Sequence, residues 1–517
     1  MLKKIYKPHE WHIIEEGFDA ANHEMSESIF SIGNGYMGQR ANFEEAYSGH
    51  TLQGTYVAGI YYPDKTRVGW WKNGYPEYFA KVLNAPNWTG IDVKISGETL
   101  DLAKVKVLSF TRILDMKNGL LNRDFSVKMS NGKEINVSAT RFVSMDRDEV
   151  AAIKYSISVQ SEMEIELTPY IDCNVRNKDS NYDESFWNAV SAYVQENKGV
   201  AIAETKKTSF CVSSGMISVI EKNGQPLAIK PSGNKTEWKV SNTYKLQAAK
   251  GDVITIYKYI AVLSTLNHEL KSLEAKTLSC LKEFADAGYE TLKKDHEKAW
   301  LHKWEESDIV IEGDVEAQQG IRFNIFHLNQ TYSGKDPRFN IGPKGFTGEK
   351  YGGSTYWDTE AFCFPFYLST ADQQVSRNLL LYRYKQLGKA IENAQKLGYT
   401  GGAALFPMVT MTGEECHNEW EITFEEIHRN GAIAFAIYDY VRYTSDHQYL
   451  ADYGLEVLIG ISRFWKQRIT FSQDKNKFVM LGVTGPNEYE NNIITNWFNS
   501  MLALWSLRYK LETSKML

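Results

Sequence analysis

One short segment near the end of the chain gathers the residue types that could bind and protonate a hydroxyl-rich ligand. It reads Leu481-Gly482-Val483-Thr484-Gly485-Pro486-Asn487-Glu488-Tyr489-Glu490-Asn491-Asn492. Gly and Pro bound it as a loop between two apolar elements, and loops held by a rigid scaffold often carry catalytic groups. Two acids and three amides fall within six residues, and Glu488 is the candidate proton donor. The same pattern is also typical of a capped turn with solvated acids.

Two other loops have a comparable content, residues 351–360 and residues 417–426. In the first, Asp358 could accept hydrogen bonds from two sugar hydroxyls beside the Trp357 ring, or could serve only as an N-cap. In the second, Trp420 is flanked by two acids, which suits a sugar subsite but also a solvated acidic helix start. No loop has metal-ligand spacing, and the chain contains no P-loop, no GxGxxG after a strand and no GxSxG elbow.

The composition is that of a globular protein with more than one domain. The chain has 517 residues, 43% of them apolar and 24% charged, which favours two or three domains. Its 13 Trp, 30 Tyr and 24 Phe offer flat rings on which sugars can stack, although large cores also need aromatic residues. The net charge of −6 argues against a nucleic-acid or anionic-membrane partner.

The cysteines and the N-terminus indicate a cellular location. Five widely spaced cysteines without a CxxC pair fit a reducing compartment better than a disulfide framework or a zinc site. The first residues lack the apolar core of a signal peptide, and no 18-residue apolar run occurs. We therefore expect a cytoplasmic protein.

The elements that must position these loops change character along the chain. In residues 1–266 apolar residues alternate, for example through 125–129 and 135–139 on either side of Asn131-Gly132, which predicts hairpins and an antiparallel sandwich. Residues 267–317 have helix-forming composition and predict a helical linker. Residues 318–517 predict helices separated by long, functional loops. Two expected helix faces are Ile433, Ile437 and Tyr440, and Trp497, Met501 and Leu504.

Several motifs resemble, in order, those of glycoside hydrolase family 65, whose members include inverting disaccharide phosphorylases. The matching segments are Glu27 to Arg40, Gly345 to Gly348, Trp357 to Glu360, His417 to Glu425 and Val483 to Tyr489. The resemblance implies an N-terminal β-sandwich, a helical linker and an (α/α)6 barrel. Since residues 318–517 supply about half of the twelve barrel helices, the C-terminal half, with the phosphate-binding residues, is expected beyond residue 517. The chain then reads as a fragment with little or no activity.

Carried over by position, the resemblance implies that Glu488 is the general acid. The residues implied to bind substrate are Trp357, Asp358, His417, Glu419, Trp420, Glu421 and Tyr489. The motif His417-Asn418-Glu419 falls in the loop that determines which glycosidic linkage and which acceptor the family uses. This motif implies maltose or a related α-glucosyl disaccharide as the substrate.

The implied reaction is reversible phosphorolysis of maltose with inversion, giving β-D-glucose 1-phosphate and D-glucose. It requires a buried carboxyl that stays protonated near neutral pH. Phosphate replaces the base-activated water of an inverting hydrolase, so neither a second carboxylate nor a metal or cofactor is needed. The resemblance also implies a homodimer. Two alternatives stay open: an inverting hydrolase, whose general base would lie beyond residue 517, and a non-catalytic sugar-binding remnant.

Overall fold

The structure is a computed structural model that describes residues 5–67, 76–416 and 422–516. The chain divides into two compact units. The first comprises Met1–Ile60, Leu83–Tyr332 and Gly345–Glu349, and the second comprises Tyr61–Val82, Ser333–Lys344 and Lys350–Leu517.

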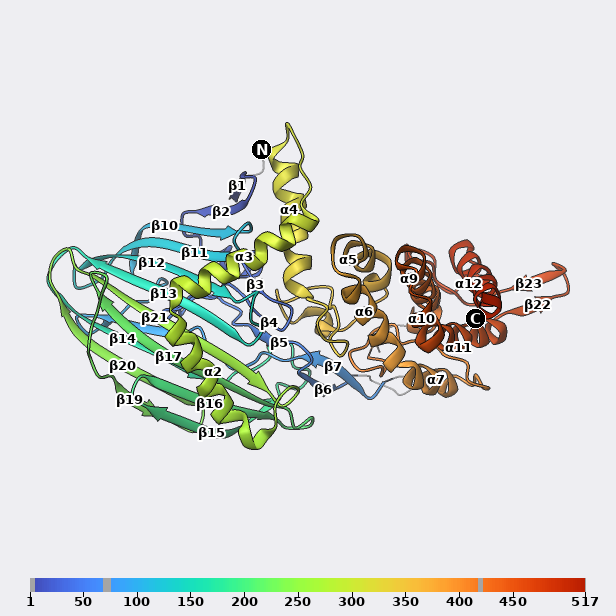
Figure 1. Cartoon of the computed structure of the whole chain (residues 1–517), viewed down its shortest axis with the longest axis horizontal. Coiled ribbons are helices and arrows are strands. Elements are labelled where there is room, and N and C mark those ends of the chain that lie inside the picture. Colours follow the sequence, from blue (N-terminus) through green and yellow to red (C-terminus); the bar gives the residue numbers. More distant parts are fainter. Residues whose placement is uncertain (1–4, 68–75, 417–421, 517) are drawn as a thin grey trace. The chain divides into compact units, whose positions relative to one another are not determined.

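A large antiparallel sheet organises the first unit. Its eleven described strands are β1 (Tyr6–Lys7), β2 (His12–Glu16), β10 (Lys106–Asp115), β11 (Leu120–Lys128), β12 (Glu134–Val143), β13 (Val150–Val159), β15 (Trp187–Gln195), β16 (Lys198–Thr205), β17 (Cys211–Lys222), β18 (Gln225–Pro226) and β21 (Val253–Ser264). Their order is β1-β2-β10-β11-β12-β13-β21-β17-β16-β15, with β18 paired to β17 (Figure 1).

The hairpin expected around Asn131-Gly132 is confirmed. Phe125 of β11 lies opposite Val137 of β12, and Val127 lies opposite Ile135, so the apolar residues of both strands share one buried face. Gly132 has φ 83°, a left-handed turn conformation that glycine adopts without a Cβ clash.

A second antiparallel sheet completes the predicted sandwich. Its strands are β8 (Ile91–Ile95), β9 (Glu98–Thr99), β14 (Met163–Asp172), β19 (Ser232–Lys235) and β20 (Lys239–Ala248), in the order β19-β20-β14-β8-β9. Strands β14 and β20 pack against β16 of the large sheet. Smaller elements of this unit are α1 (His23–Ile29), β3 (Ile32–Gly33), β4 (Met37–Gln39) and β5 (Thr55–Val57).

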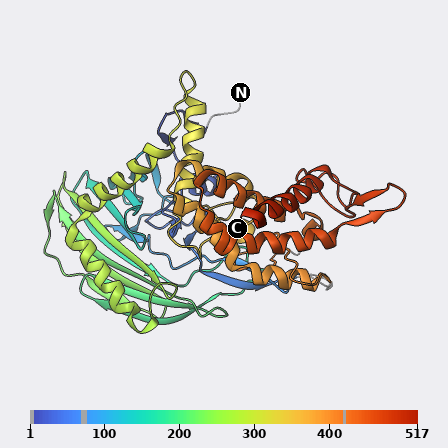
Figure 2. The same cartoon turned by 45° about the vertical axis from the view of Figure 1, so that its right-hand side comes forward.

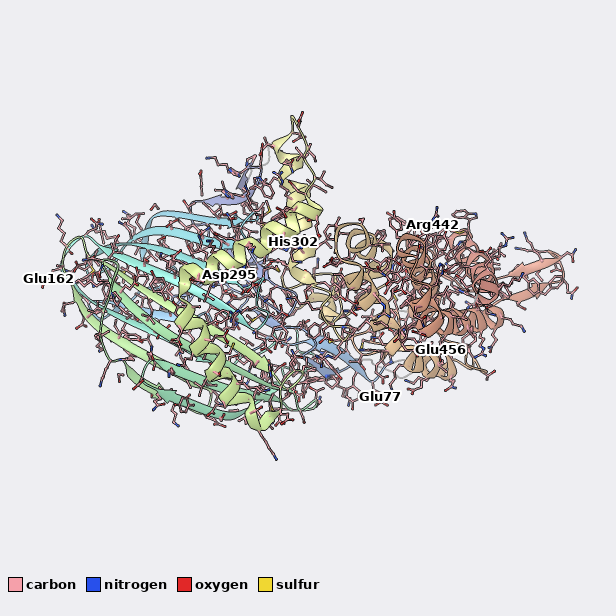
Figure 3. The ribbon with its side chains drawn as sticks, viewed as in Figure 1. Glu77, Glu162, Asp295, His302, Arg442 and Glu456 are labelled. Carbon is pink, nitrogen blue, oxygen red and sulfur yellow. The ribbon has the colours of Figure 1, made fainter. Side chains whose placement is uncertain are left out.

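Helices cover the other face of the large sheet. After η1 (Leu270–Ser272), α2 (Leu273–Ala287) and α3 (Tyr289–Ser307) bury Leu281, Phe284 and Leu292 in one cluster with residues of the sheet, and α4 (Val315–Thr331) follows. Asp295 and His302 of α3 are exposed (Figure 3). The segment predicted as a linker is therefore helical, but it belongs to the first unit because its apolar stripe packs on the sheet.

The second unit is mainly helical. Its elements are β6 (Tyr61–Lys65), β7 (Tyr78–Val82), η2 (Lys350–Gly353), η3 (Thr359–Cys363), α5 (Phe364–Thr370), α6 (Gln373–Lys385), α7 (Leu387–Lys396), α8 (Ile422–Glu425), α9 (His428–Thr444), α10 (His447–Tyr449), η4 (Leu450–Gly454), α11 (Leu455–Arg468), β22 (Thr470–Ser472), β23 (Lys477–Val479) and α12 (Trp497–Met516). Helix α9 packs against α6, α11 and α12 and buries the predicted face of Ile433, Ile437 and Tyr440. Strands β22 and β23 form a hairpin that projects beyond α11 and leads into the Glu488 loop (Figure 2).

The β6–β7 hairpin lies far from the rest of this unit in sequence. Ala80 packs in one apolar cluster with Val409, Cys416 and Ile422, and its N–H donates to Cys416 Sγ at 3.4 Å. The domain boundaries expected at residues 266 and 317 differ from the observed division here, because a piece of the N-terminal half supports a loop of the helical unit.

Helix α12 forms as expected after the Glu488 loop, but its predicted stripe does not face the core. Trp497, Met501 and Leu504 are exposed, because the opposite side, with Leu502 and Tyr509, packs toward α9 and α11. Among the described helices, none combines the length and the apolar character needed to cross a membrane.

Candidate active site

The structure describes half of the eight predicted site residues. These are Trp357, Asp358, Glu488 and Tyr489. The other four, His417, Glu419, Trp420 and Glu421, lie outside the described residues.

Trp357 lies just before η3 in an aromatic group. Its ring is 4.7 Å from the His428 ring at an interplanar angle of 83°, an edge-to-face contact, and 6.5 Å from Phe498. The side chain is half-buried. These contacts fix the ring by packing and leave part of it open to a ligand.

Asp358 occupies the N-cap position of η3 without a capping hydrogen bond from its side chain. Two roles were considered for this side chain, and the prediction that it caps the helix is therefore wrong. Although the residue is exposed, the atoms crowded around its carboxyl remove part of its hydration, which raises the pKa of Asp358. The carboxyl remains available to accept hydrogen bonds from a ligand.

The loop that carries Trp357 and Asp358 is fastened to the loop that precedes residue 417. Thr355 and Thr410 exchange two backbone hydrogen bonds, of 2.6 and 3.0 Å. Behind them, Arg383 makes a buried bidentate contact with Glu360, with N–O distances of 2.6 and 2.9 Å. The loop of Trp357 and Asp358 is thus held from two sides, by Thr410 and by Arg383.

The third loop is closed at its base by Glu425. Val483 and Ile493 pair through backbone hydrogen bonds of 3.1 and 3.0 Å. Glu425 Oε2 accepts one hydrogen bond from Thr484 Oγ1 and one from the Asn492 N–H, each 2.6 Å long. The short helix α8, which ends at Glu425, therefore holds both ends of the Glu488 loop.

Glu488 lies at the exposed tip of this loop. Its φ of 56° is left-handed, a conformation that costs a non-glycine residue about 1 kcal/mol or more, and its N–H donates to Gly485 O at 3.1 Å. The expectation that this acid is buried is wrong, because the tight turn carries its side chain outward. Tyr489 is 92% exposed, so the structure does not bring it to the other predicted residues.

The buried acid of the site is Glu426, which sequence reasoning missed. Its side chain is 1% exposed, and its Oε1 finds no donor among the described residues. The Glu488 carboxyl is among the charged groups that act on it. Burial, followed by the nearby charge of Glu488, raises the pKa of Glu426 to about 8. Asp358 adds to this effect, so the three carboxyls form one electrostatic group.

His428 is the second residue that was missed. It is fully buried, and burial together with the Arg429 charge lowers its pKa to about 4, so the ring is neutral near pH 7. In the sequence, Glu425-Glu426 reads as part of a solvated acidic helix start, and His428 follows directly after it. The signal that could have found Glu426 is its position between Ile422 and Ile427, both of which are buried.

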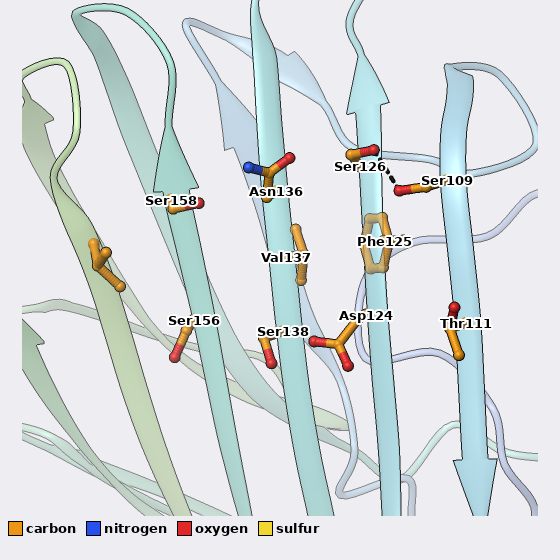
Figure 4. A pocket seen from close by; sticks show the side chains of 11 residues that line it. Ser109, Thr111, Asp124, Phe125, Ser126, Asn136, Val137, Ser138, Ser156 and Ser158 are labelled. Atoms are coloured by element: carbon orange, nitrogen blue, oxygen red, sulfur yellow. Dashed lines mark hydrogen bonds between the residues drawn. The ribbon is translucent and has the colours of Figure 1, made fainter.

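Two further features of the described residues bear on the choice of site. Within residues 5–67, 76–416 and 422–516, no three His, Cys, Asp or Glu side chains are grouped to hold a metal ion. A hollow of about 400 Å³ lies on the large sheet of the first unit, lined mainly by hydroxyls such as Ser138 and Ser156 (Figure 4). Its aromatic ring, Phe125, is 3% exposed and offers no face for stacking.

Known families match consecutive parts of the chain. Residues 13–303 match the glycosyl hydrolase family 65 N-terminal domain. Residues 322–517 match the glycosyl hydrolase family 65 central catalytic domain.

Individual relatives agree with these matches. A maltose phosphorylase from Bacillus subtilis (strain 168) is 46% identical over 99% of this chain and 67% of its own length. An alpha,alpha-trehalose phosphorylase from Thermoanaerobacter brockii is 33% identical over 98% of this chain and 66% of its own length. The solved structure of a putative kojibiose phosphorylase from human microbiome superposes with a TM-score of 0.91 at 32% identity, covering 99% of this chain and 66% of that one. The chain thus spans about two thirds of the length of these relatives, and it belongs to glycosyl hydrolase family 65.

Proposed function

We propose that the chain carries the proton donor and the glucose-binding part of a phosphorylase that cleaves maltose. The observation that carries this proposal is the grouping of the Glu488, Glu426 and Asp358 carboxyls in the same unit as the Trp357–His428 aromatic pair. The reaction is reversible phosphorolysis with inversion, in which maltose and inorganic phosphate give β-D-glucose 1-phosphate and D-glucose. The 46% identity to a maltose phosphorylase, against 33% to a trehalose phosphorylase, supports maltose as the disaccharide.

Each proposed residue has one task. Glu488 donates a proton to the glycosidic oxygen, the bond from C1 to that oxygen breaks, and an oxygen of phosphate attacks C1 from the opposite face. Trp357 packs on the C–H face of the non-reducing glucose, and Asp358 accepts hydrogen bonds from its hydroxyls. His417, Glu419, Trp420, Glu421 and Tyr489 remain proposed substrate-binding residues.

Arg429 acts on Glu426 within the described part of the chain, but we do not expect it to bind phosphate. Arg429 donates to the backbone oxygens of Phe406, Thr423 and Glu426 at 2.6 to 2.9 Å and is 2% exposed. Because its N–H groups already donate to these backbone oxygens, the Arg429 guanidinium cannot bind an anion through two parallel hydrogen bonds.

Four finer features belong to the same proposal. The helical unit corresponds to the first half of an (α/α)6 barrel, and the working assembly is a homodimer. The reaction uses no metal and no cofactor besides phosphate. A reducing, cytoplasmic location is supported by the five cysteines, all of which are free thiols.

The test is incubation of the purified chain with maltose, with and without inorganic phosphate. Release of β-D-glucose 1-phosphate that depends on phosphate supports the proposal, and it should vanish in Glu488→Gln but persist in Glu490→Gln. Release of glucose without phosphate would instead assign a hydrolase. Maltose binding in calorimetry with no turnover under either condition would assign a sugar-binding protein. An active Glu488→Gln variant would refute the role of that acid.

A further inference from the structure

Among the described residues, three aromatic rings lie beside Trp357, and they differ in how firmly they are held. Phe362 of η3 is 5.4 Å away at an interplanar angle of 59°, but its side chain is 65% exposed. Phe498 of α12 is 6.5 Å away and half-buried. The ring of His428 is nearest, at 4.7 Å and 83°, and its side chain is fully buried. Of these three rings, His428 is therefore the one that packing holds in place.

The start of α9 fixes the backbone from which His428 extends. His428 is the first residue of this helix. Two residues later, Asn430 is fully buried, and its side chain donates to Ala404 O at 2.9 Å and accepts from the Phe406 N–H at 3.0 Å. Between them, Arg429 Nε donates to Phe406 O at 2.6 Å. Because three buried hydrogen bonds hold this helix end, the ring of His428 is a rigid wall.

The same wall also touches the helix that follows the Glu488 loop. The His428 ring lies 5.7 Å from the Phe498 ring at an interplanar angle of 71°, an edge-to-face contact. Phe498 is the second residue of α12, which begins directly after that loop. His428 therefore contacts both the ring proposed to stack on glucose and the element that follows the proposed acid.

The imidazole of His428 offers an uncharged ring. Burial, followed by the Arg429 charge, lowers the pKa of His428 to about 4, and the Thr484 backbone opposes this shift only in part. The positive N-terminal end of α9 also disfavours a charged ring. Within the described part of the chain, neither ring nitrogen of His428 completes a hydrogen bond. The contact with Trp357 is therefore one of ring packing.

We propose that His428 is a positioning residue that holds the Trp357 ring in the orientation needed to stack on glucose. The proposal rests on the role of Trp357 given above and adds the group that orients it. A ring whose rotamer is locked by packing is already ordered before the sugar arrives. Without the wall, each binding event must order the Trp357 side chain, which weakens sugar binding by about threefold to tenfold.

The first test measures the order of the Trp357 ring in the free chain labelled with 5-fluorotryptophan. Trp357→Phe identifies the fluorine line of this residue, and fluorine relaxation at two magnetic fields reports how far the ring is ordered. We expect lower order in His428→Ala and unchanged order in His428→Phe, which keeps a ring at the same place. Phe362→Ala removes an exposed neighbour and should have little effect.

Equal order in His428→Ala and the unmodified chain would overturn the proposal. If His428→Ala does not fold, His428→Asn, which keeps a polar side chain but no ring, serves the same comparison. A gain of order in Phe but not in Asn at this position supports ring packing, and the reverse result would contradict it.

The second test measures maltose binding by calorimetry in a double-mutant cycle. His428→Ala should weaken binding by about threefold to tenfold, His428→Phe should restore it, and His428→Ala should add nothing in a Trp357→Leu background. An equal loss in both backgrounds would show that His428 acts by a route other than Trp357. A chain that binds no maltose refutes the proposed function, and ring order in the free chain then still decides whether His428 orients Trp357.

Kinetics separates positioning from a general loss of structure. Stacking on glucose is present before and during bond cleavage, so His428→Ala should raise KM in phosphorolysis of maltose by about threefold to tenfold and leave kcat nearly unchanged. A fall in kcat with an unchanged KM would contradict the proposal.

Discussion

Glu425 and Thr484 are joined at two points. The Glu425 carboxylate accepts from the Thr484 hydroxyl at 2.6 Å, and its backbone oxygen accepts from the Thr484 N–H at 3.2 Å. The next residue along the chain is Glu426, and the loop that begins at Thr484 carries Glu488. The segment that carries Glu426 is therefore joined to the base of the loop that carries Glu488 by the residues directly beside them.

Replacing Glu425 by Ala should release the base of the loop. Two hydrogen bonds to a carboxylate are lost, each worth about 1.5–3 kcal/mol. Because they fasten a loop, we expect the loss in local stability more than in the melting temperature. Hydrogen exchange measured by mass spectrometry should show faster exchange over residues 484–493.

The matched control for this change is Glu490→Gln, which alters an acid of the same loop that is exposed. It should leave exchange in residues 484–493 unchanged. Equal protection of this segment in Glu425→Ala and in the unmodified chain would show that the loop is held by other contacts.

The ion pair of Arg383 and Glu360 should be essential for stability. Both side chains are buried, so Arg383→Ala leaves an uncompensated carboxylate at the start of η3 and should cost about 3–5 kcal/mol. Urea unfolding measures this loss. Lys389→Ala breaks the exposed contacts with Glu392 and Glu414 and should change the free energy of unfolding little. Comparable losses in the two variants would contradict the distinction between buried and exposed pairs.

Local patterns predicted the elements of this fold well. The alternation around Phe125 and Val127 has a period of two and places both residues on one face of β11, as observed. The spacing of Ile433 and Ile437 has a helical period and places both on the buried face of α9. In each case the information lies within a few residues of the chain.

Contacts between distant segments were not predictable in this way. Ala80 reaches Cys416 across more than three hundred residues, and no local pattern assigns that strand to the helical unit. The same limit applies to the site. Glu488 was singled out from its loop, whereas Glu426 looked like part of a solvated acidic helix start, because its burial depends on packing by other segments.

Stability should fall in mild acid because of buried neutral histidines. Burial lowers the pKa of His296 to about 4, with Nδ1 accepting from the Met145 N–H and Nε2 donating to Gly119 O, each at 3.0 Å. The folded pKa lies below the ordinary value of 6.5, so the unfolded chain takes up the proton first. The contribution is complete above pH 6.5 and is lost as the pH falls toward 4.

Urea unfolding at several pH values between 6.5 and 4 measures this effect. His296→Gln should reduce the slope of unfolding free energy against pH by up to about 1.4 kcal/mol per pH unit, which corresponds to one proton. His302→Gln, an exposed histidine on the same helix α3, should keep the slope. An identical slope in all three proteins would show that His296 does not titrate on unfolding.

Glu426 should produce the opposite dependence at higher pH. Its folded pKa of about 8 lies above the ordinary value of 4.5, so between these values the folded chain keeps a proton that the unfolded chain has lost. The stability that it contributes is complete below about pH 4.5 and is lost as the pH rises through 8. Gln at this position is neutral at every pH. The free energy of unfolding of Glu426→Gln, relative to that of the unmodified chain, should therefore increase from pH 5 to pH 9. The slope of this difference against pH should approach about 1.4 kcal/mol per pH unit in the middle of this range. Glu490→Gln should show no such trend, and a difference between Glu426→Gln and the unmodified chain that stays constant over this range would show that Glu426 is already ionised in the folded protein.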